Sequence, residues 1–367
     1  MLVKNKKYIT IWIDKTNPKI VRTIDQTLLP HKFKIVSLKS CEDIIKAIKN
    51  MTVRGAPLIG VAAAYGIYLA ALEAKLKFKN TGPVDDYILG KSKEIIKTRP
   101  TAVNIAFAVI NSLTQISKEK TIAGKISTAL NFAQKLSEEE IMRCKKIGEH
   151  GLKILEKISK SKKGKTINIL THCNAGWLAC IDYGTATAPI YLAHKNGIKL
   201  HVWVEETRPR NQGANLTAWE FLQNKIPHTI ITDNAGGYVM QKGLVDIVLV
   251  GSDRTTLNGD VCNKIGTYKT ALAAKDNNIP FYVALPSSSI DKKIKNGLKD
   301  IPIEERNEDE VKYITGKSKK GLTKILIAPL KSPAKNYGFD ITPSRLVTGL
   351  ITEKGIIKPI KSEISKI

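Results

Sequence analysis

Short alternating runs of apolar and polar residues open the chain, before a longer helical pattern takes over. The runs Tyr8 to Ile13 and Phe33 to Leu38 are separated by Pro and Asn residues, as is typical of strands joined by turns. From Cys41 to about Lys160, apolar residues recur at three- and four-residue spacing, with breaks at Gly82-Pro83 and Arg99-Pro100. This spacing predicts helices. We therefore expect an N-terminal domain, residues 1–160, in which a small antiparallel sheet precedes helices, the last of them a linker helix.

The second half of the chain alternates strand-like runs with helix-like runs. The polar stretch 159–165 is typical of a loop between domains. Strands that alternate with helices imply a mostly parallel sheet covered on both faces. We therefore predict an α/β protein in which residues 161–367 form a Rossmann-like domain. The predicted strands are 166–170, 199–204, 228–231, 245–250, 280–284 and 324–327, and the predicted helices between them are 188–195, 216–223 and 264–275.

Two nucleotide-binding motifs are excluded. No GxGxxG follows any predicted strand, so a dinucleotide site has no support. Gly164-Lys165-Thr166 has the end of a phosphate-loop motif, but Ser159 stands where that motif needs Gly, and the segment precedes a strand instead of following one.

The most apolar stretch of the chain, Ala56 to Leu72, is 17 residues long, is rich in Ala and Gly, and contains Pro57. A membrane-spanning helix usually needs about 20 strongly apolar residues, so we expect a helix buried inside the protein. The N-terminus has no continuous apolar stretch of the kind found in secretory signals. These features predict a cytoplasmic protein with no membrane partner.

The cysteines and histidines have no metal-binding or disulfide spacing. Five cysteines are widely spaced without a CxxC pair, and six histidines form no HxxxH. An odd number of scattered cysteines argues against a disulfide framework, and this spacing argues against zinc. We expect neither a metal nor a cofactor.

The formal charge of +26 raises the question of nucleic-acid binding. The 59 basic residues comprise nine Arg and 50 Lys, and the Lys are scattered along the chain. Arg is the better residue for specific phosphate and base recognition, whereas Lys is a strongly hydrated surface charge. We therefore expect a Lys-rich surface without a specific nucleic-acid partner. Five of the nine Arg fall within the motifs described below: Arg54, Arg99, Arg208, Arg210 and Arg254.

Polar residues are concentrated directly after the predicted strands. Ligands of open α/β sheets bind at the carboxyl ends of the strands, so these positions are the candidates for a functional site. The segments that follow the first five strands are 171–176, 205–213, 232–234, 252–254 with 258–260, and 286–289.

Each of these residues also has a structural explanation. Cys173 can be an inert buried thiol, and Asp253 can cap a helix. Asn263 and Lys264 can simply begin the predicted helix, and Arg54 can be a solvated residue of a turn. His172 is better explained as a hydrogen-bonded structural imidazole than as a base, because nothing adjacent in sequence would orient it.

Motifs along nearly the whole chain resemble the methylthioribose-1-phosphate isomerase family, and they occur in the family's order. They include MTVRGAP, RPTAVN, THCNAG and ETRPRNQGANLTAWE, followed by TDNAGG, GDVCNKIGTY, PFYVALPSSSID and FDITPSRLVTGLITEKG. These motifs occupy residues 51–57, 99–104, 171–176, 206–220, 232–237, 259–268, 280–291 and 339–355.

The resemblance implies a fold, a reaction and a set of site residues. The family has an N-terminal domain of strands and helices and a Rossmann-like C-terminal domain, and it is usually a homodimer. By resemblance, Cys173 is the catalytic cysteine and Asp253 is the general acid. The substrate contacts implied in the same way are Arg54, Gly55, Ala56, Arg99, Gln212, Asn263 and Lys264.

The implied reaction converts 5-methylthioribose 1-phosphate to 5-methylthioribulose 1-phosphate, a step of methionine salvage. The chain departs from the common family pattern at Trp177 and at Asp182 to Thr185, so the 5-substituent of the substrate stays open. A close alternative is an isomerase of 5-deoxyribose 1-phosphate or ribose 1,5-bisphosphate. A second alternative is a non-catalytic subunit that resembles those of translation initiation factor two-B, against which the presence of Cys173 and Asp253 argues.

Overall fold

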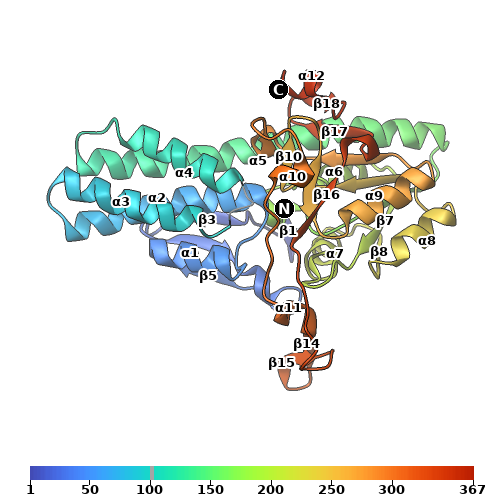
Figure 1. Cartoon of the computed structure of the whole chain (residues 1–367), viewed down its shortest axis with the longest axis horizontal. Helices are drawn as coiled ribbons and strands as arrows, with labels where there is room; N and C mark the ends of the chain where they lie inside the picture. The colour runs from blue at the N-terminus through green and yellow to red at the C-terminus, as the bar shows by residue number, and fades with distance from the viewer. Residues whose placement is uncertain (100–102) are drawn as a thin grey trace.

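The computed structural model describes residues 1–99 and 103–367, and it combines a helical part with a part built on a seven-stranded sheet (Figure 1). The motif at 99–104 is therefore described only in part, because Pro100, Thr101 and Ala102 lie outside the described residues. The helical part comprises α1 (Cys41–Lys49), α2 (Ala56–Lys77), α3 (Thr81–Ile96), α4 (Val103–Ile116) and α5 (Ile122–Ser161).

The predicted antiparallel sheet at the start of the chain is present. β4 (Val21–Ile24) pairs antiparallel with both β3 (Ile11–Ile13) and β5 (Ile35–Leu38). The outer strands lie inside the two predicted runs, whereas β4 lies between them and was not predicted. A separate two-stranded pair, β1 (Leu2–Val3) with β2 (Lys6–Lys7), precedes this sheet.

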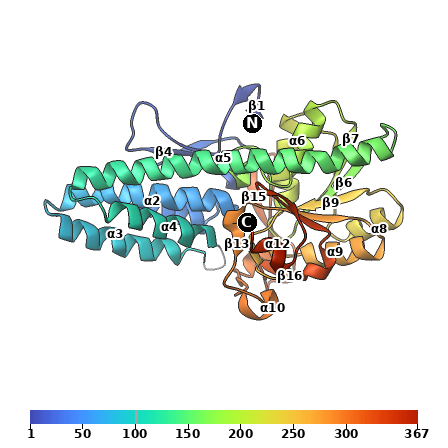
Figure 2. The same cartoon turned by 90° about the horizontal axis from the view of Figure 1, so that it is seen from above.

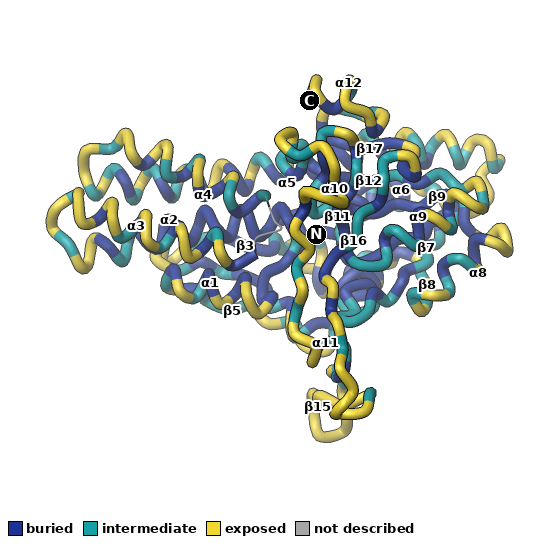
Figure 3. The backbone as a smooth tube through the Cα atoms, in the orientation of Figure 1, coloured by how far each residue is buried: buried dark blue, intermediate teal, exposed yellow. Residues whose placement is uncertain are grey.

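The apolar helix α2 lies at the centre of the helical part, where it packs against α1, α3, α4 and α5. It is long and apolar enough to cross a membrane, but 89% of its apolar window is buried. Figure 3 shows this burial along most of the helix. The prediction of a buried helix is confirmed, because four neighbouring helices pack around most of its length.

Seven strands form the main sheet, in the order β18-β17-β12-β9-β6-β7-β8. Its pairs are parallel, except that β18 runs antiparallel at one edge. The prediction of a mostly parallel sheet is thus confirmed. The strands are β6 (Ile167–Thr171), β7 (Leu200–Glu205), β8 (His228–Ile231), β9 (Ile247–Val250), β12 (Phe281–Ala284), β17 (Gly349–Thr352) and β18 (Gly355–Ile357).

Helices cover both faces of this sheet, and the pleat of β6 explains how. Ile167 and Ile169 belong to a core with Leu155 of α5 and Ile190 of α6 (Ala188–Lys195). Leu170 points to the opposite face, into a core that includes residues of α8 (Ala235–Gln241) and α9 (Thr267–Asp276). Successive side chains of a strand face opposite sides of a sheet, so one buried strand supplies both cores.

The long helix α5 belongs to both parts of the molecule (Figure 2). Ala133 and Leu136, from its first half, pack in the core of the helical part. Ile147 and Leu155, from its second half, pack in a core of the sheet. The helix continues through Ser161, so the loop predicted at 159–165 is shorter than expected. The predicted boundary after residue 160 falls in the last turn of this shared helix.

Two sequence-based assignments are wrong. Residues 324–327 were predicted as a strand of the parallel sheet, but β15 (Gly321–Leu326) pairs antiparallel with β14 (Tyr313–Ser318) in a hairpin that projects from the body (Figure 1). Asn263 and Lys264 were predicted to begin a helix, but they end strand β11 (Val261–Lys264), and α9 begins only at Thr267. Apolar β-branched runs indicate a strand without specifying its partner.

The described residues also form a second, smaller sheet and four short α-helices. β11 belongs to a four-stranded sheet of order β13-β10-β11-β16. Its other strands are β10 (Arg254–Thr256), β13 (Ile290–Asp291) and β16 (Phe339–Thr342), and the short helices are α7 (Ala218–Gln223), α10 (Gly297–Asp300), α11 (Asp309–Lys312) and α12 (Lys361–Ile364).

Candidate active site

Cys173 lies just beyond the carboxyl end of β6, in an unusual backbone conformation. Its φ is 62°, in the left-handed region that residues other than glycine rarely adopt. The Cys173 backbone N–H donates to Thr207 Oγ1 at 2.8 Å, and Thr217 Oγ1 donates to the Cys173 carbonyl at 2.7 Å. Such conformations persist where the surroundings hold them, often at functional sites. Two hydroxyl groups thus fix the backbone of the predicted catalytic cysteine.

Asp253 follows β9, the strand that pairs with β6. Its backbone N–H donates to the Cys262 carbonyl at 3.0 Å, which fixes it beside β11. Because the two strands are parallel neighbours, their carboxyl ends meet at one edge of the sheet. Asp253 and Cys173 line the same cavity, so the predicted pair is brought together.

Arg54 reaches this cavity from the segment before α2. Its guanidinium donates to the Asn174 side-chain oxygen at 2.6 Å and to the Asn174 carbonyl at 3.0 Å, and Nη2 lies 3.9 Å from the Cys173 sulfur. Gly55 has φ of 100°, and a Cβ there would lie 2.4 Å from the Ala179 carbonyl oxygen. No side chain fits at Gly55, so the backbone at Gly55 and Ala56 borders the cavity directly.

The other predicted substrate contacts do not all line the cavity of Cys173. Asn263 lines the cavity of Cys173, whereas Gln212 lines an adjoining cavity that shares Arg54. Arg99 and Lys264 are outside both sets of lining residues. Arg99 Nε donates to Glu304 at 2.9 Å, and Lys264 Nζ donates to the Gly338 carbonyl at 2.8 Å. These two cations are buried, already have partners, and both act electrostatically on Asp253.

Burial favours the neutral forms of Cys173 and Asp253. Desolvation raises the pKa of the Cys173 thiol, against the opposing influence of Arg54 and Lys264. Desolvation also raises the pKa of the Asp253 carboxyl, although Lys264, Arg99 and Arg54 oppose it. Burial lowers the pKa of Lys264. The direction expected for a proton donor at position 253 is therefore present.

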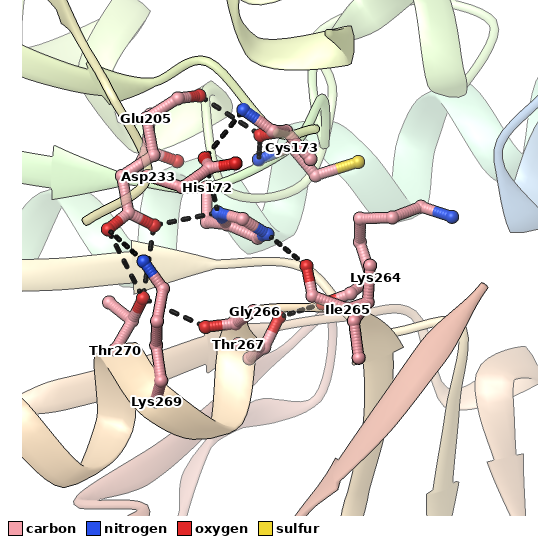
Figure 4. Close-up of polar contacts among 12 residues, drawn as sticks. His172, Cys173, Glu205, Asp233, Lys264, Ile265, Gly266, Thr267, Lys269 and Thr270 are labelled. Carbon is pink, nitrogen blue, oxygen red and sulfur yellow. Dashed lines mark hydrogen bonds and ion pairs between the residues drawn. The ribbon is translucent and has the colours of Figure 1, made fainter. Parts of the chain in front are cut away.

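His172 has both ring nitrogens engaged (Figure 4). Nδ1 lies 2.7 Å from Glu205 Oε2, and Nε2 lies 2.8 Å from the Ile265 carbonyl oxygen. Burial disfavours the charged ring, but the contact with Glu205 outweighs it, so the pKa of His172 is raised. The imidazole joins the loop of Cys173 to the segment after Lys264, which fits the structural role expected for it.

One group among the described residues has metal-binding composition. His172, Glu205 and Asp233 have potential ligand atoms within 4.8 Å of one another. However, His172 Nδ1 faces Glu205, and Asp233 accepts from the backbone N–H groups of Thr207 and Arg208 at 2.7 Å each. These contacts describe a buried hydrogen-bond network that braces the strand ends.

The sequence analysis missed the residues that hold the site in place. Glu220 is fully buried, and its carboxylate accepts from Asn174 Nδ2 at 2.9 Å and from the Leu178 backbone at 3.0 Å. Asn174 in turn accepts from Arg54. Glu220 lies within a motif of the resemblance, but no local pattern shows that its carboxylate is buried.

Trp177 and Cys180 both follow Cys173 closely in the chain, but only Cys180 borders the cavity. Trp177, the departure from the family pattern, is fully buried and packs against Trp219 at a ring distance of 6.3 Å. It is absent from the cavity lining, so it fills the core. Cys180, seven residues after Cys173, lines the cavity and packs with Cys144. It is therefore unsuitable as a neutral control for Cys173.

A sequence model of the Initiation factor 2 subunit family matches residues 52–359. The methylthioribose-1-phosphate isomerase of Desulfatibacillum aliphaticivorans is 54% identical, with 98% of this chain and 96% of the relative covered. The isomerase of the same name from Brucella anthropi is 50% identical, with the same coverage of 98% and 96%.

Solved structures extend these similarities. The 5-methylthioribose 1-phosphate isomerase of Pyrococcus horikoshii OT3 superposes with a TM-score of 0.83 at 38% identity, covering 98% of this chain and 96% of that one. A translation initiation factor eIF-2B subunit delta from A. fulgidus superposes with a TM-score of 0.78 at 38% identity, covering 98% and 99%. Since half of its residues are shared with the isomerases over almost the whole length, the chain belongs to the methylthioribose-1-phosphate isomerase family.

Proposed function

We propose that this protein isomerises 5-methylthioribose 1-phosphate to 5-methylthioribulose 1-phosphate, a step of methionine salvage. The observation that carries the proposal is the meeting of Cys173, Asp253 and Arg54 in one buried cavity at the carboxyl end of the sheet. Isomerase relatives that are 50–54% identical over 98% of the chain support it.

The substrate's phosphate sets the chemical problem. A phosphate on the anomeric oxygen blocks the simple opening to an aldehyde, so a proton must reach the ring oxygen. Asp253 is suited to donate it, because burial raises the pKa of its carboxyl. Hydrogen then moves from C2 to C1, and the C2 hydroxyl returns its proton to the Asp253 carboxylate as the ketone forms, with the neutral thiol of Cys173 beside the reacting carbons.

Arg54, Gly55 and Ala56 are the residues best placed for the phosphate. Arg54 adds a guanidinium to the backbone at the start of α2, and the N-terminus of a long helix favours anions. Arg99 and Lys264 contribute positive charge close to the site, since both affect the Asp253 carboxyl. Asn263 and Gln212 are the proposed polar contacts to the sugar.

The decisive experiment compares turnover of the purified protein on three sugar phosphates. These are 5-methylthioribose 1-phosphate, 5-deoxyribose 1-phosphate and ribose 1,5-bisphosphate, with formation of the ketose followed by NMR. We expect the highest kcat/KM on the methylthio substrate. Higher kcat/KM on another sugar phosphate would reassign the substrate. The absence of turnover on all three would favour a non-catalytic role as a subunit similar to the translation initiation factor eIF-2B subunit delta from A. fulgidus.

We also propose that the protein is a cytoplasmic homodimer, on the basis of the family resemblance. Light scattering on the purified protein tests the stoichiometry: a mass near twice 40.5 kDa is expected, and a monomer would contradict it. Fractionation of the source cells tests the compartment.

A further inference from the structure

The cavity of Cys173 adjoins a second cavity, and Arg54 lines both. Their volumes are about 30 Å³ and 60 Å³, each smaller than typical ligand pockets of roughly 300–1,000 Å³. A sugar phosphate would therefore need both spaces, with Arg54 turning from Asn174 towards the phosphate. The second cavity is thus the available place for the part of the substrate that lies away from the reacting carbons.

Two buried glutamines give the second cavity its polar character. Gln26 and Gln212 line it and are only 4% and 5% exposed. Among the described residues, neither side-chain oxygen has a hydrogen-bond donor. A buried acceptor without a donor is destabilising, and such groups in a folded protein often await water or a ligand. The cavity therefore offers two acceptors to a molecule that carries hydroxyl groups.

Gln26 is held too firmly to satisfy its oxygen by turning. Its backbone N–H donates to the Thr52 carbonyl at 3.1 Å, and its Nε2 donates to the Leu178 carbonyl at 2.8 Å. The first bond ties it to the segment that leads to Arg54, and the second ties it to the loop after Cys173. The carbonyl oxygen of Gln26 is consequently the half of the amide left for a ligand.

Apolar side chains form the rest of this wall. Leu29, Met51 and Leu216 line the second cavity and are at most 4% exposed. The cation Arg210 also lines it, but its guanidinium is paired with Glu310 at 2.8 Å. Carbonyl acceptors, apolar groups and a neutralised cation do not suit a second phosphate. They suit a hydroxyl group next to an apolar substituent.

We propose that the N-terminal segment 26–29 completes the substrate site, with Gln26 accepting a hydrogen bond from the sugar's C3 hydroxyl and Leu29 packing against the apolar 5-substituent. This inference rests on the proposed isomerase function and deepens it. The reaction fixes C1 and C2 beside Cys173 and Asp253, so C3 and the 5-substituent are the groups left to enter the second cavity. Residues 26–29 precede the part of the chain, 52–359, that the family model matches.

The test measures dissociation constants by calorimetry in the Asp253→Asn background, where turnover is blocked. Binding of 5-methylthioribose 1-phosphate is compared with binding of its 3-deoxy analogue. We expect Gln26→Met to weaken binding of the full substrate about tenfold and binding of the 3-deoxy analogue less than twofold. Equal weakening of both would mean that Gln26 acts only on the fold, and would overturn its contact with the sugar.

The apolar part is tested with Leu29→Ser and a matched control, Leu28→Ser, whose side chain is half-buried and outside the cavity lining. Leu29→Ser should weaken binding of the methylthio substrate about tenfold more than it weakens binding of ribose 1-phosphate. Leu28→Ser should change the dissociation constants of the two ligands by the same factor. The proposal would be overturned if the ratio of the two dissociation constants, for the methylthio substrate and for ribose 1-phosphate, were the same in both variants. If wild-type protein binds the methylthio substrate but does not convert it, the proposed function is wrong. The ratios of dissociation constants still show whether residues 26–29 contact the bound sugar phosphate.

Discussion

The cavity of Cys173 and the hairpin β14–β15 are both rich in positive charge, but in opposite environments. Arg54, Arg99 and Lys264 are 7–9% exposed and have hydrogen-bond partners. Lys317, Lys319, Lys320 and Lys324 of the hairpin are exposed, and the burial colours of the backbone tube in Figure 3 show β15 as exposed. Water screens the hairpin charges, whereas the buried charges act strongly on Asp253. Burial, and not the number of charges, decides which ones have chemical consequences.

The largest difference in kcat is expected between a variant of Asp253 and a variant of an exposed aspartate near the hairpin. Asp253→Asn keeps the shape but removes the transferable proton, so kcat should fall by ~10²–10⁴-fold while substrate still binds. Asp309→Asn is the control, because Asp309 is half exposed and pairs with Lys324 at 3.4 Å. Steady-state kinetics of both variants test the contrast. Near-normal kcat in Asp253→Asn would exclude the proton-donor role.

Cys173→Ser should lower kcat by ~10²-fold, as does removal of a group that stabilises a transition state. The control is Cys41→Ser, since Cys41 is equally buried but belongs to the core of the helical part. Substituting Cys41 should lower the melting temperature while kcat changes little. If the two serine variants lose kcat to the same degree, cysteine loss acts through the fold and not through the site.

Arg54→Met should raise KM by ~10–150-fold, because a charge-assisted hydrogen bond contributes ~1.5–3 kcal/mol. Lys319→Met, on the exposed hairpin, removes the same formal charge and should leave KM unchanged. Kinetics together with thermal melting separate binding from folding. An unchanged KM in Arg54→Met would remove this residue from the phosphate site.

The pH profile should have an alkaline limb that depends on Asp253. A general acid is competent only while protonated, so kcat should be constant below the pKa of Asp253 and fall about tenfold per pH unit above it. Burial raises this pKa, Lys264, Arg99 and Arg54 oppose the rise, and Glu304 adds to it. In Asp253→Asn the limb should disappear from the residual activity; its persistence would assign the titration to another group, such as Lys264.

The smallest effect is expected on the hairpin itself. Replacing Lys317, Lys319, Lys320 and Lys324 by Gln should change neither kcat nor KM, because exposed charges are screened by salt. A duplex-binding titration at physiological salt should show no specific complex for the parent protein or this variant. A salt-resistant, sequence-specific complex that the substitutions abolish would give the surface charge a function.

Local sequence patterns predicted an element correctly where its secondary structure did not depend on the elements that pack against it. The spacing after Cys41 predicted helices, and α6 coincides with the predicted 188–195. The strand-end rule brought Cys173 and Asp253 to one cavity, because parallel strands align their carboxyl ends. The same rule could not predict Gln26 or Glu220, since neither residue directly follows a strand of the seven-stranded sheet.

The α/β class and the family could be predicted from the sequence, because periodicity and motifs are properties of neighbouring residues. Tertiary structure alone decided that β15 leaves the sheet, that Lys264 ends a strand, and that Cys180 borders the cavity of Cys173. Strand pairing, burial and hydrogen-bond partners depend on residues far apart in the chain. Gln26 and Leu178 are joined by a hydrogen bond in this way, and only folding brings them together.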